Sequence, residues 1–128
     1  MNISKKTQYG MRAMVFLAKK YSKKELAPLK DVSGKEAIPF DFLEKIFSEL
    51  EKAKLVKGKK GIGGGYILAR NPNKITAKNI VEALEKTVPV DCLLCDKNKR
   101  CVSKNVWKKI ENNINKTLNS IKLSDLIR

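Results

Sequence analysis

The glycine- and lysine-rich segment 57–65 constrains the fold of this chain more than any other part of the sequence. It reads Lys-Gly-Lys-Lys-Gly-Ile-Gly-Gly-Gly and lies between two short β-prone runs, residues 55–56 and 66–69. Two short strands joined by such a loop are typical of a β-hairpin. The Gly-x-x-x-x-Gly-Lys-Ser/Thr pattern is missing and the loop joins strand to strand, so the sequence argues against a nucleotide-phosphate loop.

Amphipathic helical patterns precede this hairpin. The spacing of apolar residues predicts helices over 4–21, 29–35 and 39–54, the first capped by Ser4. Pro39 suits the first position of the third helix, because its missing N–H is not needed there. The residues expected to hold this helix against the core are Phe42, Leu43, Ile46, Phe47 and Leu50. The second helix is expected to bury Leu29, Val32 and Ala37.

Two more helices are predicted after the hairpin. Thr76 is placed to cap a helix that ends near Lys86, with Ile80, Val81 and Leu84 buried. Ser103 is placed to cap a last, long helix, which carries an apolar stripe. A long terminal helix with such a stripe usually needs a partner, so we expect it to pair with its symmetry mate in a homodimer. The residues of this dimerisation stripe are Val106, Trp107, Ile110, Ile114, Leu118 and Ile121.

The order of short helix, tight turn, longer helix and basic hairpin predicts a winged helix-turn-helix. The chain is therefore expected to be mainly α with a small β-hairpin wing and a long C-terminal dimerisation helix. At 128 residues it has the length of one continuous domain. Residues 1–75 would form the winged helix-turn-helix DNA-binding region, and residues 76–128 would carry a sensor loop (91–101) and the dimerisation helix.

The charge of the chain favours a polyanionic partner. Lys and Arg number 28 against 13 acidic residues, a formal charge of +15. Such a charge favours DNA, RNA or an anionic membrane surface, although part of the lysine excess can serve only to solvate the surface. With the winged pattern, it predicts double-stranded DNA as the partner. The sequence has no signal peptide and no apolar run long enough to span a bilayer, so we expect a cytoplasmic protein without a membrane partner.

In a winged helix-turn-helix the longer helix enters the major groove, while the hairpin and first helix contact the backbone. Phe40 is placed to touch a thymine methyl group. Glu44 has two readings: it accepts a hydrogen bond from a cytosine amino group, or it only stabilises the helix by its dipole and by pairing with Lys45 or Lys52. The predicted DNA-contacting residues are Ser4, Lys5, Lys6, Tyr9, Pro39, Phe40, Asp41, Glu44, Lys45, Lys59, Lys60, Gly63, Gly64 and Tyr66.

Several of these segments resemble the IscR/NsrR-type family of bacterial winged helix-turn-helix regulators. Residues 55–68 resemble the family's wing, 42–50 its recognition helix, 9–14 its first helix, and the Trp107 helix with 122–126 its C-terminal part. The resemblance implies a homodimer on a palindromic operator, and often an iron–sulfur cluster that senses redox state, nitric oxide or iron–sulfur status. Lys60 stands where the family usually has arginine, and lysine lacks the planar fork of a guanidinium group.

Three cysteines, Cys92, Cys95 and Cys101, lie within ten residues in a C-x2-C-x5-C arrangement. Their thiolates suit an iron–sulfur cluster, either 2Fe-2S or 4Fe-4S, while a zinc site and metal-free redox thiols are the alternatives. The histidine of IscR-like members is replaced by Lys104, and the first-helix acid of NsrR-like members by Gln8. Asp91, Asp96, Gln8, or an external thiolate or water are left as candidates for a fourth ligand.

The sequence argues against an enzyme. It contains no histidine, and no nucleophile–base pair or pair of carboxylates can be assembled from residue spacing, so we predict no small-molecule substrate. Two other function classes stay open. One is a metal-free regulator of the same fold that responds to a small molecule or a partner protein, and the other is a basic RNA-binding protein.

Overall fold

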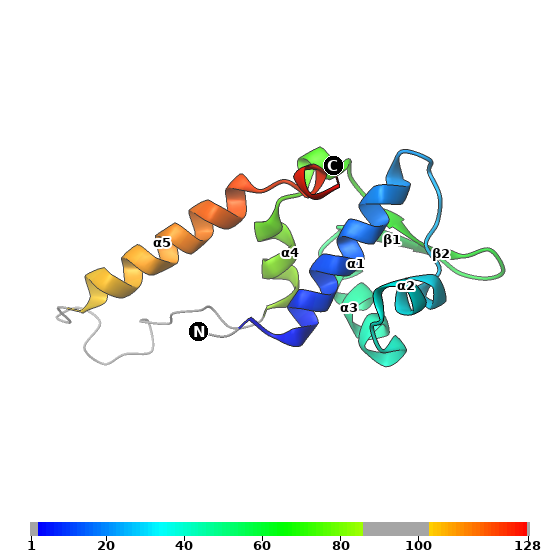
Figure 1. Cartoon of the computed structure of the whole chain (residues 1–128), viewed down its shortest axis with the longest axis horizontal. Helices are drawn as coiled ribbons and strands as arrows, with labels where there is room; N and C mark the ends of the chain where they lie inside the picture. Colours follow the sequence, from blue (N-terminus) through cyan, green and yellow to red (C-terminus); the bar gives the residue numbers. More distant parts are fainter. Residues whose placement is uncertain (1–2, 86–102, 128) are drawn as a thin grey trace.

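A computed structural model describes residues 3–85 and 103–127 of the chain (Figure 1). Its elements in chain order are α1 (Lys5–Tyr21), α2 (Leu29–Glu36), α3 (Phe40–Lys52), β1 (Val56–Lys59), β2 (Gly65–Leu68), η1 (Pro72–Lys74), α4 (Ala77–Leu84), α5 (Lys104–Ser120) and η2 (Leu123–Leu126). β1 and β2 pair in an antiparallel hairpin, with Val56 opposite Leu68 and Lys59 opposite Gly65. The predicted winged helix-turn-helix, mainly α with a small hairpin, is therefore confirmed.

One apolar core joins α1, α3, α4 and the hairpin. Helix α1 lies across the other elements (Figure 1) and buries Ala13, Met14 and Leu17. Helix α3 contributes Leu43, Ile46, Phe47 and Leu50, while α4 contributes Ile80 and Leu84. Gly10 lets α1 approach α4, because a Cβ atom there would lie 2.1 Å from Leu84 Cδ1. The core thus fixes α3 by one side and leaves its other side free.

The helix ends follow the predicted caps closely. Ser4 accepts a hydrogen bond from the Thr7 N–H at 3.2 Å, and Thr76 forms a capping box with Asn79. The turn between α2 and α3 contains Ala37 in the left-handed conformation, with φ 53°. Pro39 lies at the N-cap of α3, one position before the helix in which we predicted it.

Four predictions of burial were wrong. Leu29 is only partly buried, although it packs against the core from the start of α2. Phe42 is 39% exposed, because it lies in the first turn of α3, where its ring packs on Tyr9 at the surface. Ala37 is exposed, since it forms the left-handed C-cap of α2 and not part of its apolar face. Val81 is only partly buried, because α4 directs Ile80 and Leu84 into the core.

Helix α5 extends away from the body of the molecule (Figure 1). None of its residues is buried. Its C-terminal end is fastened to the body by backbone hydrogen bonds of 2.8 Å, from Ala77 N–H to the Ile121 carbonyl and from Leu123 N–H to the Ile75 carbonyl. Leu123 is itself buried. Among residues 3–85 and 103–127, no helix has both the length and the apolar character needed to cross a bilayer.

Candidate nucleic-acid interface

The exposed side of α3 is polar over its first three turns. Asp41, Glu44, Lys45 and Ser48 are exposed, whereas Leu43, Ile46 and Phe47 face the core. Their spacing of three and four residues places them on one side of the helix. Glu44 takes part in no ion pair within the described residues, so its pairing with Lys45 or Lys52 is not formed here. This side of α3 can therefore meet a partner with charged and hydrogen-bonding groups.

Two aromatic rings extend this surface from α3 onto α1. Tyr9 and Phe42 meet edge to face, with ring centroids 5.5 Å apart. The Arg12 guanidinium group lies 5.7 Å from the centre of the Tyr9 ring and is tied to the end of α2 through Glu36. Sequence reasoning missed Phe42 and Arg12, because helical periodicity places Phe42 with the core and does not distinguish Arg12 from other surface cations.

The hairpin is held against the chain before α2. Ala27 and Tyr66 exchange two backbone hydrogen bonds, of 2.8 and 2.9 Å. A side chain at position 65 would collide with this contact, because its Cβ would lie 2.6 Å from the Ala27 carbonyl carbon. Lys57, Lys59 and Lys60 are all exposed on the hairpin. The base of the wing is thus fixed, while its cations face solvent.

A hollow of about 290 Å³ separates the wing from the two helices of the helix-turn-helix. Lys30 borders it from α2, Phe40 from the start of α3, and Lys59 and Lys60 from the wing. Tyr66 closes its inner side, with its ring packed on Phe47 at a centroid distance of 4.7 Å. Burial raises the pKa of Tyr66, and the nearby Glu51 and Glu44 carboxylates raise it further. The phenol therefore keeps its proton at neutral pH and can donate a hydrogen bond.

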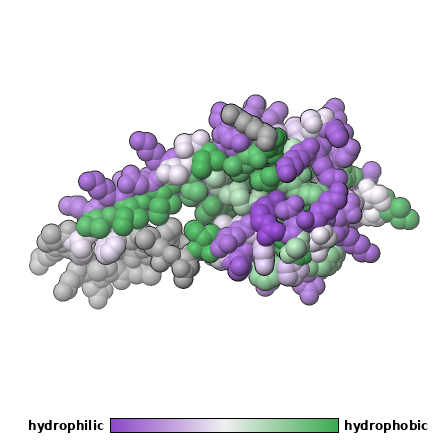
Figure 2. Space-filling model, viewed as in Figure 1, coloured by the Kyte–Doolittle hydropathy of each residue, from purple (hydrophilic) through white to green (hydrophobic). Residues whose placement is uncertain are grey.

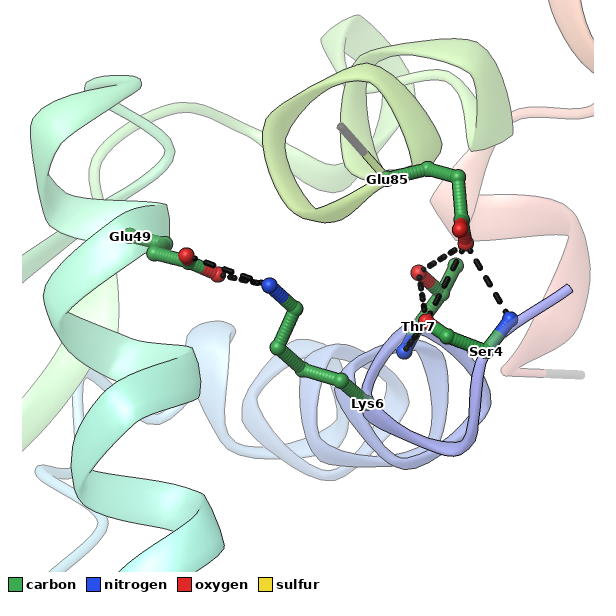
Figure 3. A network of polar contacts seen from close by, with 5 residues as sticks. All are labelled: Ser4, Lys6, Thr7, Glu49 and Glu85. Carbon is green, nitrogen blue, oxygen red and sulfur yellow. Dashed lines mark hydrogen bonds and ion pairs between the residues drawn. The ribbon is translucent and has the colours of Figure 1, made fainter. Parts of the chain in front are cut away.

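The N-terminal end of α1 is joined to the end of α4 by a cluster of hydrogen bonds (Figure 3). One oxygen of the Glu85 carboxylate accepts from the Thr7 hydroxyl at 2.6 Å, and from the Ser4 hydroxyl and Ser4 N–H at 3.2 Å each. The hydrogen bond from Thr7 lowers the pKa of Glu85 and outweighs the opposite effect of desolvation, while both bonds from Ser4 and the nearby Lys6 add to the lowering.

Lys6 joins the same end of α1 to α3. Its Nζ atom lies 2.9 Å from one Glu49 carboxylate oxygen and 3.1 Å from the other (Figure 3). Glu49 lies on α3 beside the buried Leu50, so this ion pair adds a polar contact to the apolar packing between α1 and α3. Ser4 and Lys6, both predicted to contact DNA, therefore also hold the fold together.

The Glu85 cluster predicts a pH-dependent stability. Because the folded-state pKa is lowered, the stabilisation is complete above the ordinary value of 4.5 and is lost as the pH falls through the lowered pKa. We expect Glu85→Gln to reduce the free energy of unfolding by about 1 kcal/mol at pH 7, with the difference from the parent chain shrinking in acid. Urea denaturation at a series of pH values measures the loss of unfolding free energy at pH 7 and its decrease in acid. Glu82→Gln is the control, since Glu82 forms only a surface i,i+4 pair with Lys78; an equal loss in both variants would contradict the prediction.

Helix α5 carries a second exposed surface, which is apolar. Figure 2 shows one side of this helix as hydrophobic and the other as hydrophilic. Val106 is 53% exposed and Trp107 is 40% exposed. The remaining members of the predicted dimerisation stripe, Ile110, Ile114, Leu118 and Ile121, are partly exposed. An apolar strip of this length on a projecting helix is typical of a protein–protein contact.

Comparison with known proteins gives the family. The sequence model described as "Rrf2: Iron-dependent Transcriptional regulator" matches residues 3–128. The chain belongs to the Rrf2 family. Its relatives include the HTH-type transcriptional regulator IscR of Pectobacterium atrosepticum, which is 31% identical over 99% of this chain and 79% of the relative. As its relatives are named transcriptional regulators, this Rrf2 protein is a regulator and not an enzyme.

Solved structures of two Rrf2 regulators are similar to this one throughout. "T. potens IscR" superposes with a TM-score of 0.82 at 34% identity, and covers 99% of this chain and 86% of its own. CymR (YrzC), described as the global cysteine regulator of B. subtilis, superposes with a TM-score of 0.83 at 34% identity, and covers 99% of this chain and 96% of its own. The similarity therefore includes α5 as well as the winged part.

The structure brings the predicted interface residues of this Rrf2 protein together from three elements. Phe40, Asp41, Glu44 and Lys45 lie on the exposed side of α3, and Tyr9 adjoins it from α1. Lys59, Lys60, Gly64 and Tyr66 border the hollow beside it. Their contact with DNA stays a prediction, as does that of Ser4, Lys5, Lys6, Pro39 and Gly63.

The predicted sensor residues Cys92, Cys95 and Cys101 lie outside the described residues. Within residues 3–85 and 103–127, no group of three or more cysteine, aspartate or glutamate side chains is placed to hold a metal ion. The cluster on these cysteines therefore stays a prediction from the sequence.

Proposed function

We propose that this Rrf2 regulator is a homodimer that binds a palindromic operator, with α3 in the major groove and the wing beside it. One observation carries this proposal: the first residue of α3, Phe40, and the cationic hairpin border a single hollow, which is also lined by Lys30, Lys59 and Lys60. A sugar–phosphate strand that follows the edge of the major groove would meet these cations in passing from α3 to the wing.

The proposed dimer rests on α5. Val106 and Trp107 are about half exposed, and leaving this apolar area in water is unfavourable. Covering it with the same strip of a second copy is the simplest arrangement, because two-fold isologous dimers are the commonest oligomers. Two copies related by a two-fold axis would present two α3 helices. For binding to one palindrome, their separation must match one helical turn, about 34 Å.

We further propose that Cys92, Cys95 and Cys101 bind an iron–sulfur cluster through which the regulator senses redox state, nitric oxide or iron–sulfur status. The three thiols in this spacing and the family's description as iron-dependent support this. When bound, such a cluster would supply one-electron chemistry and reactivity toward oxidants. Anaerobic purification followed by a visible absorption spectrum and iron and sulfide analysis tests it.

A metal-free regulator of the same fold is the second candidate. It is supported by the similarity to CymR, which is described as a cysteine regulator. Protein that is colourless and free of iron and sulfide after anaerobic reconstitution, yet still binds its operator, would establish this alternative in place of the cluster.

DNA selected from a randomised duplex pool by the full chain tests the proposed function. We expect the selected sequences to be palindromic and bound more tightly than random duplexes. Binding without preference for palindromic duplexes, or a preference for RNA, would contradict it. The contribution of the wing is measured by the slope of log affinity against log salt concentration. Replacing Lys59 and Lys60 together with alanine should reduce that slope by about 0.9 for each lysine that neutralises a phosphate.

The control for this slope is Lys116→Ala, which removes an exposed cation from α5, away from the wing (Figure 1). It should leave the slope unchanged. If the Lys59 and Lys60 variant keeps the slope of the parent chain, the wing does not contact the backbone.

A further inference from the structure

An apolar side chain lies at the tip of the cationic wing. Ile62 is 108% exposed, more than any other large hydrophobic residue in the described part of the chain. The outermost end of the loop between β1 and β2 is hydrophobic in Figure 2. Single exposed apolar residues are common on protein surfaces. Ile62 differs from these in its setting, because Lys57, Lys59 and Lys60 are exposed on the same hairpin.

The backbone places Ile62 at the corner of a tight turn. Gly64 N–H donates to the Gly61 carbonyl at 3.0 Å, which closes a four-residue turn with Ile62 in its second position. Gly63, in the third position, has φ 77°, as a type II turn requires of that position. In this position the Ile62 side chain is fully exposed.

Ile62 has no role in the packing of the described core. Cβ atoms built at Gly61 and Gly63 would meet nothing within 4 Å, so the two residues beside Ile62 stand in open space. The base of the wing, by contrast, is fixed by the Ala27–Tyr66 hydrogen bonds. The chain therefore holds an unpacked isoleucine at a defined place, beyond the lysines that border the hollow next to α3.

We propose that Ile62 is a specificity-determining residue, which enters the minor groove flanking each half-site and favours A·T pairs there. This inference rests on the proposed DNA-binding function. Wing lysines would be drawn to the strongly negative potential of a narrow, A·T-rich minor groove, and an aliphatic side chain would pack on its floor. A G·C pair places the guanine 2-amino group on that floor. Packing isoleucine against this donor would bury it without an acceptor, which is unfavourable.

Inosine gives a direct test, since an I·C pair lacks the 2-amino group but keeps the major-groove pattern of G·C. The probes are three versions of one duplex selected by the parent chain, with A·T, I·C or G·C pairs at the positions that flank the half-sites. Affinities are measured for the parent chain, Ile62→Ser and Lys60→Ala. We expect the parent chain to bind the A·T and I·C duplexes about equally and the G·C duplex about tenfold more weakly.

The variants separate specificity from general affinity. Ile62→Ser should lose most of the preference among the three duplexes, whereas Lys60→Ala should weaken binding to all three and keep the order. Because Ile62 is fully exposed among the described residues, the serine variant should unfold at the same urea concentration as the parent chain. If Ile62→Ser keeps the full preference, or the parent chain binds I·C and G·C flanks equally, the inference is overturned, while specific binding by the parent chain would still uphold the proposed function.

A membrane-inserting role for the same tip is tested in parallel by sedimentation with phosphatidylglycerol vesicles. The shared hollow between wing and α3 favours DNA over lipid as the partner. Loss of vesicle binding in Ile62→Ser, with unchanged preference among the three duplexes, would also overturn the inference.

Discussion

Replacing Trp107 with aspartate is expected to turn the proposed dimer into a monomer and to abolish binding to a palindromic operator. Trp107 is 40% exposed in the isolated chain and lies within the apolar strip of α5. Truncating a tryptophan that an interface buries costs about 2 kcal/mol or more, and a two-fold dimer loses two of them, so the dimer would dissociate about a thousandfold more readily. Analytical ultracentrifugation and operator titration measure the two effects.

Asn112→Asp provides the matched control for this experiment. It adds the same charge to α5, at an exposed position turned away from the apolar strip. The control should remain dimeric and bind its operator. A Trp107→Asp chain that sediments as a dimer would show that the strip serves another purpose, and a monomeric Asn112→Asp chain would show that charge alone accounts for the change.

Gly64→Ala is expected to disrupt the wing. A Cβ atom at this position would lie 2.2 Å from the Lys59 carbonyl oxygen and 2.8 Å from that of Gly61. Both atoms are backbone, so the hairpin must open for the methyl group to fit. We expect a loss of about 1–3 kcal/mol in the free energy of unfolding. Operator affinity should fall by at least about tenfold, since Lys59 and Lys60 would be displaced from the hollow.

Gly34→Ala separates this steric effect from a general effect of replacing glycine. Gly34 lies within α2, and a Cβ atom there would meet nothing within 4 Å. Its replacement should stabilise the chain by roughly 0.5–1 kcal/mol, because alanine favours a helix more than glycine does. The two variants should therefore move the urea midpoint in opposite directions. A Gly64→Ala chain as stable as its parent would mean that the wing turn adapts without cost.

Much of the fold could be predicted from local sequence patterns. The caps at Ser4 and Thr76, the turn before α3 and the glycine-rich hairpin each depend on a few neighbouring residues, and each was predicted in its place. The first strand is longer than predicted, because β1 continues through Lys57 and Gly58 to Lys59. The error at Ala37 arose because the residue lies beyond the end of α2, in its left-handed C-cap. The errors at Phe42 and Val81 have another cause. Periodicity shows which side of a helix is apolar, but not how far the neighbouring elements extend to cover it.

The polar contacts that join α1 to α3 and α4 could not be predicted from the sequence. Glu85 meets Ser4 and Thr7 across most of the chain, and Lys6 meets Glu49 between two helices. Such pairs depend on the tertiary arrangement of α1, α3 and α4, and the spacing of residues along the sequence does not predict them. The exposed face of α3 was predicted except for Phe42, because the buried stripe of Leu43, Ile46 and Phe47 leaves the remaining side chains of the helix outside the core.

The backbone pairing of Thr76 with Lys122 has a mechanical consequence. Helix α4 begins beside this pairing, and α5 ends beside it. Helix α4 is locked into the core through Ile80 and Leu84, whereas no residue of α5 is buried. Because the C-terminal end of α5 is hydrogen-bonded to the body at Ile75 and Ala77, we expect a rotation about that end to move the exposed apolar strip of α5 relative to α3.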